Sequence, residues 1–151
     1  MAAARPERLV LTLAQRDELV AHAAESAAEI CGVILGRDDR ATRVVRLRNA
    51  AEDRRASGSL QRSAETGYVI DPLQLRDVFL EIDATGERVL AYYHSHPAFA
   101  APRPSRTDIH DARSSGENVA ALFVVIHGGR PRAYAIDDDA TEVAIGIADQ
   151  K

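Results

Sequence analysis

The sequence predicts a single α/β domain, residues 1–151, with a mixed β-sheet of about seven or eight strands flanked by three helices. The chain has 151 residues, which suits one domain and leaves little room for two. Hydrophobic residues make up 46% and charged residues 28% of it, as in ordinary globular proteins. Short apolar runs bounded by turn residues alternate with segments whose apolar residues recur at helical spacing, which is typical of α/β domains.

The first third of the chain predicts a strand, a helix and a hairpin. Residues 9–12 form a short apolar run, and Thr12 can begin a helix because Gln15, three residues later, completes a capping box. The apolar stripe of this helix consists of Leu19, Val20, Ala23, Ala24 and Ala27. Residues 30–47 predict a hairpin, in which an apolar strand ends at Gly36 and a second strand alternates charged and apolar residues.

The middle of the chain predicts a loop and then an amphipathic helix. Residues 51–66 are polar, small and arginine-rich without any period, so we expect a mobile loop there. A strand over residues 67–70 follows. Asp71 and Pro72 then predict a helix start, with an N-cap followed by proline at the first helical position. The apolar residues of this helix are Leu75, Val78, Phe79 and Ile82, and Gly86 ends it.

The last third predicts four strands and one short helix. The expected elements are a strand over residues 89–95, a proline-rich loop over 97–104, a helix from Ser105 to Gly116, a strand over 119–126, and two final strands over 132–136 and 142–147. The strand over 119–126 is uniformly apolar, which predicts a central strand covered on both faces.

The charge balance argues against a general nucleic-acid binder. The chain holds 19 basic and 23 acidic residues, a net charge of −4. Residues 37–62 hold eight arginines and four acids, a local excess of +4. This segment is either a surface that faces a partner or a solvated hairpin and loop.

The sequence also predicts a cytoplasmic protein without a membrane segment. The longest apolar stretch has eight residues, far fewer than the roughly 20 that cross a bilayer. The first residues have no apolar core of a secretory signal. Cys31 is the single cysteine, so no disulfide can form within the chain. A lone cysteine in an apolar strand is typical of a small buried residue.

The most informative stretch is His94-Ser95-His96-Pro97. Residues two apart on a strand face the same way, so both imidazoles can reach one zinc ion. Asp108, twelve residues after His96, offers a third ligand. The segment from Ser105 to Asp108 also has the pattern of a helix capping box, and capping alone would explain both residues. Two histidines and one carboxylate would leave a fourth position open for water, as in catalytic zinc sites.

These residues resemble the JAMM motif of the MPN+ (Mov34/PAD-1-like, JAB domain) zinc metalloproteases. The motif has an upstream glutamate, then His-Ser/Thr-His-Pro, a short loop, and Ser-x-x-Asp. Here the glutamate is Glu29, in a Glu-x-Cys-Gly stretch similar to that of short stand-alone bacterial members. The resemblance covers nearly the whole chain and implies the MPN/JAB fold, which is similar to that of cytidine deaminases. The loop over residues 97–104 is one residue longer than is usual.

The resemblance implies a role for each residue. His94, His96 and Asp108 would hold one Zn²⁺ per chain, and Glu29 would be the general base that takes a proton from the bound water. Ser105 would donate a hydrogen bond to the developing oxyanion. Ser95 would support the metal ligands without binding the ion itself. No other cofactor is expected.

The family's activity implies the substrate. We expect hydrolysis after the C-terminal Gly-Gly of a ubiquitin-like or sulfur-carrier protein, whose extended tail could pair beside an exposed edge strand. The arginine-rich segment would contact an acidic partner. The alternatives are a non-catalytic MPN-type scaffold or binding module and a nucleobase-type zinc hydrolase; the second would need a pair of cysteines that this chain lacks.

Overall fold

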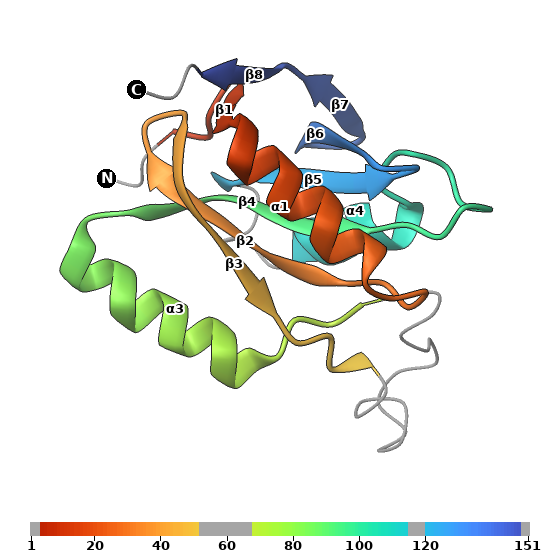
Figure 1. Ribbon diagram of the computed structural model, residues 1–151, viewed down its shortest axis with the longest axis horizontal. Coiled ribbons are helices and arrows are strands. Elements are labelled where there is room, and N and C mark those ends of the chain that lie inside the picture. Colours follow the sequence, from red (N-terminus) through yellow and green to blue (C-terminus); the bar gives the residue numbers. More distant parts are fainter. Residues whose placement is uncertain (1–3, 52–67, 115–119, 149–151) are drawn as a thin grey trace.

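The computed structural model describes residues 4–51, 68–114 and 120–148, and in these ranges it has one eight-stranded sheet and three helices. This confirms the predicted fold class (Figure 1). The elements are β1 (Leu9–Thr12), α1 (Leu13–Ala24), β2 (Cys31–Arg37), β3 (Arg40–Leu47), α3 (Pro72–Thr85), β4 (Arg88–Ser95), α4 (Arg106–Ser114), β5 (Leu122–His127), β6 (Arg130–Ile136), β7 (Ala140–Val143) and β8 (Ile145–Ala148).

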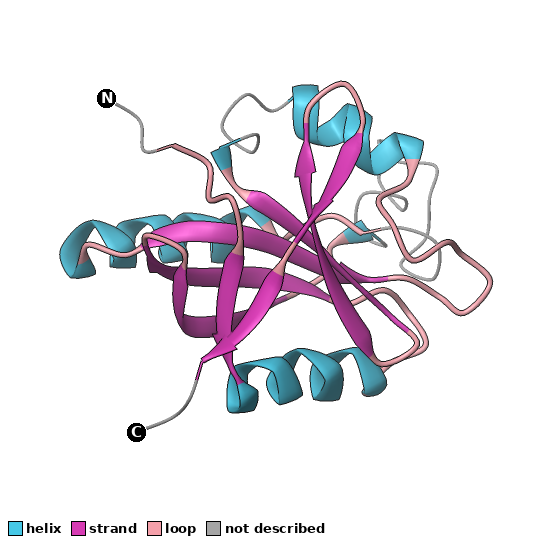
Figure 2. Cartoon of the chain, turned by 90° about the horizontal axis from the view of Figure 1, so that it is seen from above, coloured by secondary structure: helices cyan, strands magenta, loops and turns pink. Residues whose placement is uncertain are grey.

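The strands lie in the order β7-β6-β5-β4-β2-β3-β1-β8. Parallel pairs join β4 to β5 and β1 to both β3 and β8, and the other neighbours are antiparallel. Only Ala144 separates β7 from β8, although these strands form opposite borders of the sheet. The sheet must therefore curl until its two borders lie close together, and the strands fill the middle of the molecule with helices around them (Figure 2).

Both long helices begin as their cap residues predict. The Thr12 hydroxyl accepts from the backbone N–H of Gln15, and the Gln15 side chain accepts from the backbone N–H of Thr12. At α3 the Asp71 carboxylate accepts from the N–H groups of Leu73 and Gln74. Gly86 ends α3 with φ of 77°, in the left-handed region that glycine adopts without a steric penalty.

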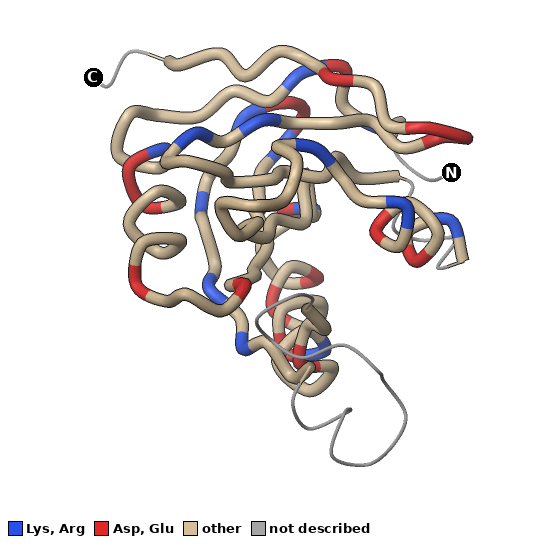
Figure 3. Tube along the Cα trace, turned by 90° about the vertical axis from the view of Figure 1, so that its right-hand side faces the viewer, with Lys and Arg blue, Asp and Glu red and all other residues tan. Residues whose placement is uncertain are grey.

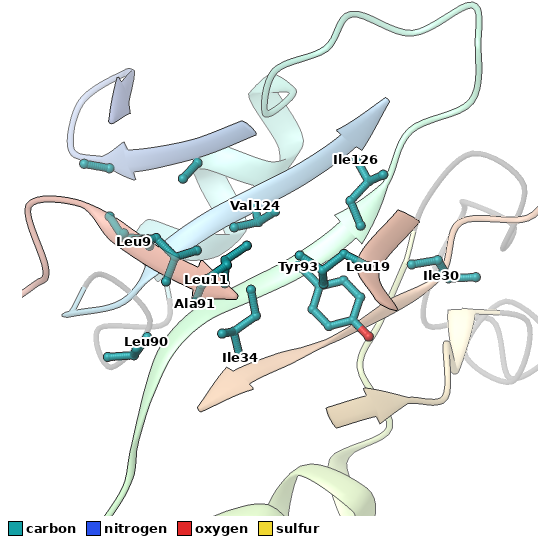
Figure 4. Close-up of a cluster of buried hydrophobic side chains, with 13 residues drawn as sticks. Leu9, Leu11, Leu19, Ile30, Ile34, Leu90, Ala91, Tyr93, Val124 and Ile126 are labelled. Carbon is teal, nitrogen blue, oxygen red and sulfur yellow. The ribbon is translucent and has the colours of Figure 1, made fainter. Parts of the chain in front are cut away.

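Two buried clusters cover the two faces of the sheet. Leu19 of α1 packs with Leu9, Leu11, Ile34 and Tyr93 on one face (Figure 4). On the other face, residues of β2, β4 and β5 pack against Val78 of α3 and Ala112 of α4. In Figure 1, α1 accordingly lies in front of the sheet and α4 behind it. The apolar strand β5 is buried from Leu122 to Ile126, as a central strand should be.

Three of the expected elements differ from the structure. The first helix ends at Ala24, so Ala27 of its expected apolar stripe lies beyond it. Residues 142–147 are not one strand: β7 pairs with β6, whereas β8 pairs with β1 at the other border. Of the strand expected over 67–70, the described part contributes only an isolated bridge between Ile70 and Asn49. The loop expected over 51–66 lies outside the described residues from residue 52 onward. The end of the short helix, expected at Gly116, and the start of the next strand, expected at residue 119, also lie outside them.

Three of the five described arginines of the basic segment, Arg43, Arg46 and Arg48, bind acidic side chains of the same chain. Arg46 binds two glutamates, one on α1 and one directly after it, and Arg48 binds Asp71 at 3.1 Å. Arg43 binds Glu87 at 2.9 Å, and hydrogen bonds from Arg43 and then Thr42 lower the pKa of Glu87 to about 2. Basic and acidic positions are interspersed along the trace (Figure 3). This pairing favours the solvated-hairpin interpretation for the described part.

Within residues 4–51, 68–114 and 120–148, every helix is too short or too polar to cross a bilayer.

Candidate metal centre

The candidate site lies near the end of β4, beside the buried cluster that packs against α3 and α4. Tyr92 lies in that cluster, and the alternation of the strand places His94 on the same side. His96 continues the extended chain beyond β4, because its backbone N–H donates to the carbonyl of Ile126 at 3.0 Å. The two imidazoles therefore project together, 4.8 Å apart between ring centres.

Asp108 meets both histidines from α4. One of its carboxylate oxygens, Oδ2, lies 3.2 Å from Nε2 of His94 and 3.2 Å from Nε2 of His96. The two Nε2 atoms are 2.9 Å apart. His94 is 0% and Asp108 5% exposed, so these polar atoms converge in an almost dry place. The structure thus brings together all three residues that were predicted to bind a metal.

The tautomer of His96 suits a metal ligand. Its Nδ1 lies 2.7 Å from the carbonyl oxygen of Ala101, which can only accept a hydrogen bond. In the neutral ring the proton is therefore on Nδ1, which leaves the Nε2 lone pair for an ion; in the protonated ring Nε2 also carries a proton and donates it to Asp108. A backbone carbonyl that holds the far nitrogen in this way is the usual support of a metal-binding histidine.

Both interpretations of the Ser105–Asp108 pair hold at once. The Ser105 hydroxyl accepts from the Asp108 N–H at 3.0 Å, and the Ser105 N–H donates to Oδ2 of Asp108 at 2.9 Å, which completes a capping box. The same oxygen faces the histidines. Although burial favours the neutral acid, hydrogen bonds with His94 and His96 hold the pKa of Asp108 well below its ordinary value. Asp108 is therefore a carboxylate at neutral pH.

The donor set fits a zinc ion. Tetrahedral zinc with bonds of about 2.0–2.1 Å holds its ligand atoms roughly 3.3 Å apart. The three separations here are 2.9, 3.2 and 3.2 Å, so one point can lie at bonding distance from all three atoms. Two imidazole nitrogens and one carboxylate oxygen are ligands that zinc accepts.

Glu29 also reaches this place. One of its carboxylate oxygens lies within 4.8 Å of a ring nitrogen of each histidine, and the residue is 7% exposed. Its backbone is held on both sides. Asn49 donates to the Glu29 carbonyl at 2.8 Å, while Ser95 accepts from the N–H of Ile30 at 2.9 Å and donates its own N–H to the Ile30 carbonyl at 3.1 Å. The hydroxyl of Ser95 thus faces away from the histidines and fixes the start of β2 beside them.

Sequence reasoning assigned no role to Tyr68 or Asn49. The ring of Tyr68 stacks on His94, with ring centres 4.2 Å apart and planes 19° apart. The side-chain oxygen of Asn49 accepts from the N–H groups of Ala51 and Val69, at 2.9 and 3.0 Å. Asn49 therefore connects the backbone of Glu29 to that of Ala51 and to that of Val69, the neighbour of Tyr68. Neither residue belongs to a short motif, so no local signal could have identified them.

Cys31 is a buried structural residue, as expected. It is 0% exposed, and its thiol lies 3.7 Å from the carbonyl oxygen of Leu47. Burial raises the pKa of the Cys31 thiol to about 12, so the nucleophilic thiolate is essentially absent at neutral pH.

The expected edge strand is not found beside the site in the described part of the chain. Glu29 precedes β2, the two histidines lie at the end of β4 or directly after it, and each of these strands is paired on both sides. The borders of the sheet are β7 and β8, which carry none of the site residues. A substrate tail that pairs beside the site would have to use some other backbone.

The loop over residues 97–104 is held at several points despite its extra residue. His96 binds Ala101, Tyr134 donates to the Pro102 carbonyl at 2.7 Å, and His127 lies 3.3 Å from the Ala98 carbonyl oxygen. The longer loop still brings Ser105 into its capping position, so the extra residue is absorbed before the helix begins.

The chain is similar to known proteins in sequence and in fold. Residues 12–138 match the family described as prokaryotic homologs of the JAB domain. Over 108 residues the chain is 32% identical to the desampylase of Haloferax volcanii, a match that covers 67% of this chain and 70% of that protein. The solution structure of a Desulfitobacterium hafniense protein is similar with a TM-score of 0.72 at 26% identity, over 94% of each chain.

A JAB1/MPN domain protein from Archaeoglobus fulgidus shares the fold at 13% identity, with a TM-score of 0.54 over 91% of this chain and 99% of that one. The family match spans most of the chain, and the desampylase match exceeds 30% identity over two thirds of both proteins. The chain therefore belongs to the family of prokaryotic homologs of the JAB domain.

Proposed function

We propose that the protein is a zinc-dependent peptidase or isopeptidase that hydrolyses the bond after the C-terminal Gly-Gly of a ubiquitin-like or sulfur-carrier protein. The observation that carries the proposal is the convergence of Glu29, His94, His96 and Asp108 in one nearly dry place. The relative at 32% identity supports the substrate class, because its name, desampylase, denotes removal of a ubiquitin-like modifier.

The chain's own residues would divide the work as follows. His94, His96 and Asp108 would hold the ion, which when bound polarises a carbonyl and acidifies water. The Glu29 carboxylate would take the water's proton and return it to the leaving amine. The Ser105 hydroxyl accepts one hydrogen bond from Asp108 and keeps its own proton, which it could donate to the oxyanion. Ser95 would position Glu29 through Ile30 without touching the substrate.

The decisive experiment replaces Glu29 by Gln. We expect Glu29→Gln to fold and bind one zinc per chain, and to cleave a fusion of a Gly-Gly-tailed carrier to a leader peptide roughly 10²–10⁴-fold more slowly, the range typical of a lost general base. Zinc would be measured by atomic emission after dialysis and cleavage by gel, with and without chelator.

Glu81→Gln, an exposed glutamate on α3, is the matched control and should cleave at the wild-type rate. Unchanged turnover of Glu29→Gln would remove Glu29 from the mechanism. Absence of zinc from the wild-type protein, together with no cleavage, would instead support the scaffold alternative.

A further inference from the structure

We propose that a cavity beside His96 binds the hydrocarbon part of the residue that leaves as the amine, so that the enzyme selects apolar leaving groups. The inference rests on the proposed function and adds a specificity site to it. Apart from Ser95 and His96, it concerns residues that have no role assigned above.

The cavity measures about 470 Å³ and lies between the end of α1 and the turn that follows β4. Val20 and Ile126 form part of its lining, and so do Ser95 and His96. His96 lines this cavity and its Nε2 also faces Asp108, so the cavity adjoins the metal centre at this residue. A substrate carbonyl placed at that centre would have one end of its chain beside this space.

The lining is mostly small and apolar, and its polar members are Ser26, Ser95 and His96. Four alanines from the end of α1 and the following bend contribute to it, together with Gly128 and Gly129. Among the described residues that line the cavity there is no Asp, Glu, Lys or Arg. A polar side chain that entered would lose water without gaining a charged partner, whereas an aliphatic one would be stabilised by burial.

Phe99 forms one wall and is 82% exposed, the most exposed of the large hydrophobic residues in the described chain. The backbone around it is nonetheless held, because the Ala100 N–H donates to the Pro97 carbonyl at 3.0 Å, and the Ala98 and Ala101 carbonyls face His127 and His96. An aromatic ring that a fixed loop presents to solvent beside a candidate active site is typical of a contact residue.

The proposed substrate determines which part of it can fill the cavity. The two glycines on the acyl side of the scissile bond have no side chains, so they cannot fill an apolar cavity. The amine side does carry a side chain: an ordinary one after a linear bond, or the aliphatic stem of a lysine after an isopeptide bond. The cavity therefore suits the amine side.

The test measures binding separately from catalysis. Two blocked peptides, Ala-Gly-Gly-Leu-Ala and Ala-Gly-Gly-Asn-Ala, differ in one side chain of nearly the same shape. Titrated by calorimetry into zinc-loaded Glu29→Gln, the leucine peptide should bind roughly tenfold more tightly, as expected for burial of one aliphatic side chain. Ala27→Trp, which fills the cavity from an exposed position, should reduce the preference below about threefold. Phe99→Ala, which removes the wall, should do the same.

Matched controls lie on α3, away from the cavity. Ala84→Trp and Leu80→Ala are changes of the same kind at exposed positions, and both should keep the tenfold preference. Equal affinity for the two peptides, a preference that survives Ala27→Trp, or no binding of either peptide at millimolar concentration would each overturn the inference. If the wild-type protein cleaves the Gly-Gly fusion in that case, the inference alone fails; if it neither binds zinc nor cleaves, the proposed function fails as well.

Discussion

His94 is held from two sides, by the Asp108 carboxylate at 3.2 Å and by the face of the Tyr68 ring. The carboxylate fixes the position of one ring nitrogen, and the stacked ring restricts rotation of the imidazole plane. A ligand that is already oriented loses less conformational entropy when it binds an ion. Tyr68 therefore has the geometry of a positioning residue for the metal centre.

Tyr68→Ala should weaken zinc binding by about 10–100-fold, the range for loss of a group that supports a metal ligand. Tyr68→Phe keeps the stacked ring and should bind zinc within about threefold of the wild-type protein, because the aromatic contact is retained. Competition with a fluorescent zinc chelator would measure both affinities. Equal zinc affinity in all three proteins would show that stacking on His94 has no positioning role.

The sequence predicted the residues of the site better than their supports. His94, His96 and Asp108 lie in a short motif: strand alternation predicts that the two histidines face the same way, and the family resemblance implies Asp108 beside them. Glu29 could be identified through the family resemblance alone, because without it a glutamate after a helix is expected in solvent. Tyr68 and Asn49 act through contacts with residues 20 or more positions away, which neither periodicity nor spacing encodes.

At the scale of elements, the packing of β2 on β4 sets the register of the site. Cys31 pairs with His94, and Gly32 with Tyr93. The Tyr93 ring lies over Gly32, and its hydroxyl lies 2.7 Å from Nδ1 of the buried His22 on α1. One tyrosine thus connects two strands to the helix that covers them.

Gly32→Ala should lower the free energy of unfolding by about 2 kcal/mol or more, as overpacking of a filled core does. A β-carbon at this position would overlap both the Tyr93 ring and the carbonyl oxygen of Val45. Gly146→Ala in β8 is the control, because its β-carbon would be 3.9 Å from the nearest side-chain atom of Val10 and should cost little. Urea unfolding would compare the variants. Equal stability would mean that Tyr93 can move aside without penalty.

Element boundaries followed from local signals where caps were present. Thr12 and Asp71 begin their helices, and Gly86 ends α3, as their residue types predict. The apolar run after Thr141 looked like one strand, because local alternation cannot reveal that Ala144 transfers the chain from one border of the sheet to the other. That choice depends on the curl of the whole sheet.

For the whole molecule, the metal centre connects distant parts of the chain. Its proposed ligands come from the end of β4 and the start of α4, and Glu29 precedes β2. An ion that binds only the folded protein stabilises it by mass action, by about 2.7 kcal/mol at a concentration 100 times its dissociation constant. For a domain of this size, that free energy corresponds to roughly 5–10 °C in melting temperature.

Zinc should therefore raise the melting temperature of the metal-free protein by about 5–10 °C at such a concentration. Magnesium at the same concentration should not, because imidazole ligands suit zinc rather than magnesium. Differential scanning fluorimetry would record both. His96→Ala should abolish the zinc effect while His110→Ala, an exposed histidine of α4, retains it. An equal rise in both variants would place the zinc elsewhere.

The single residue between β7 and β8 also has a consequence for motion. Border strands of a sheet usually fray independently, since each has only one neighbour to lose. Here Ala144 ties the two borders to each other, and its carbonyl accepts from the N–H of Leu9 at 3.0 Å. Peeling one border would pull on the other, so local opening at the two ends of the sheet becomes one cooperative event instead of two.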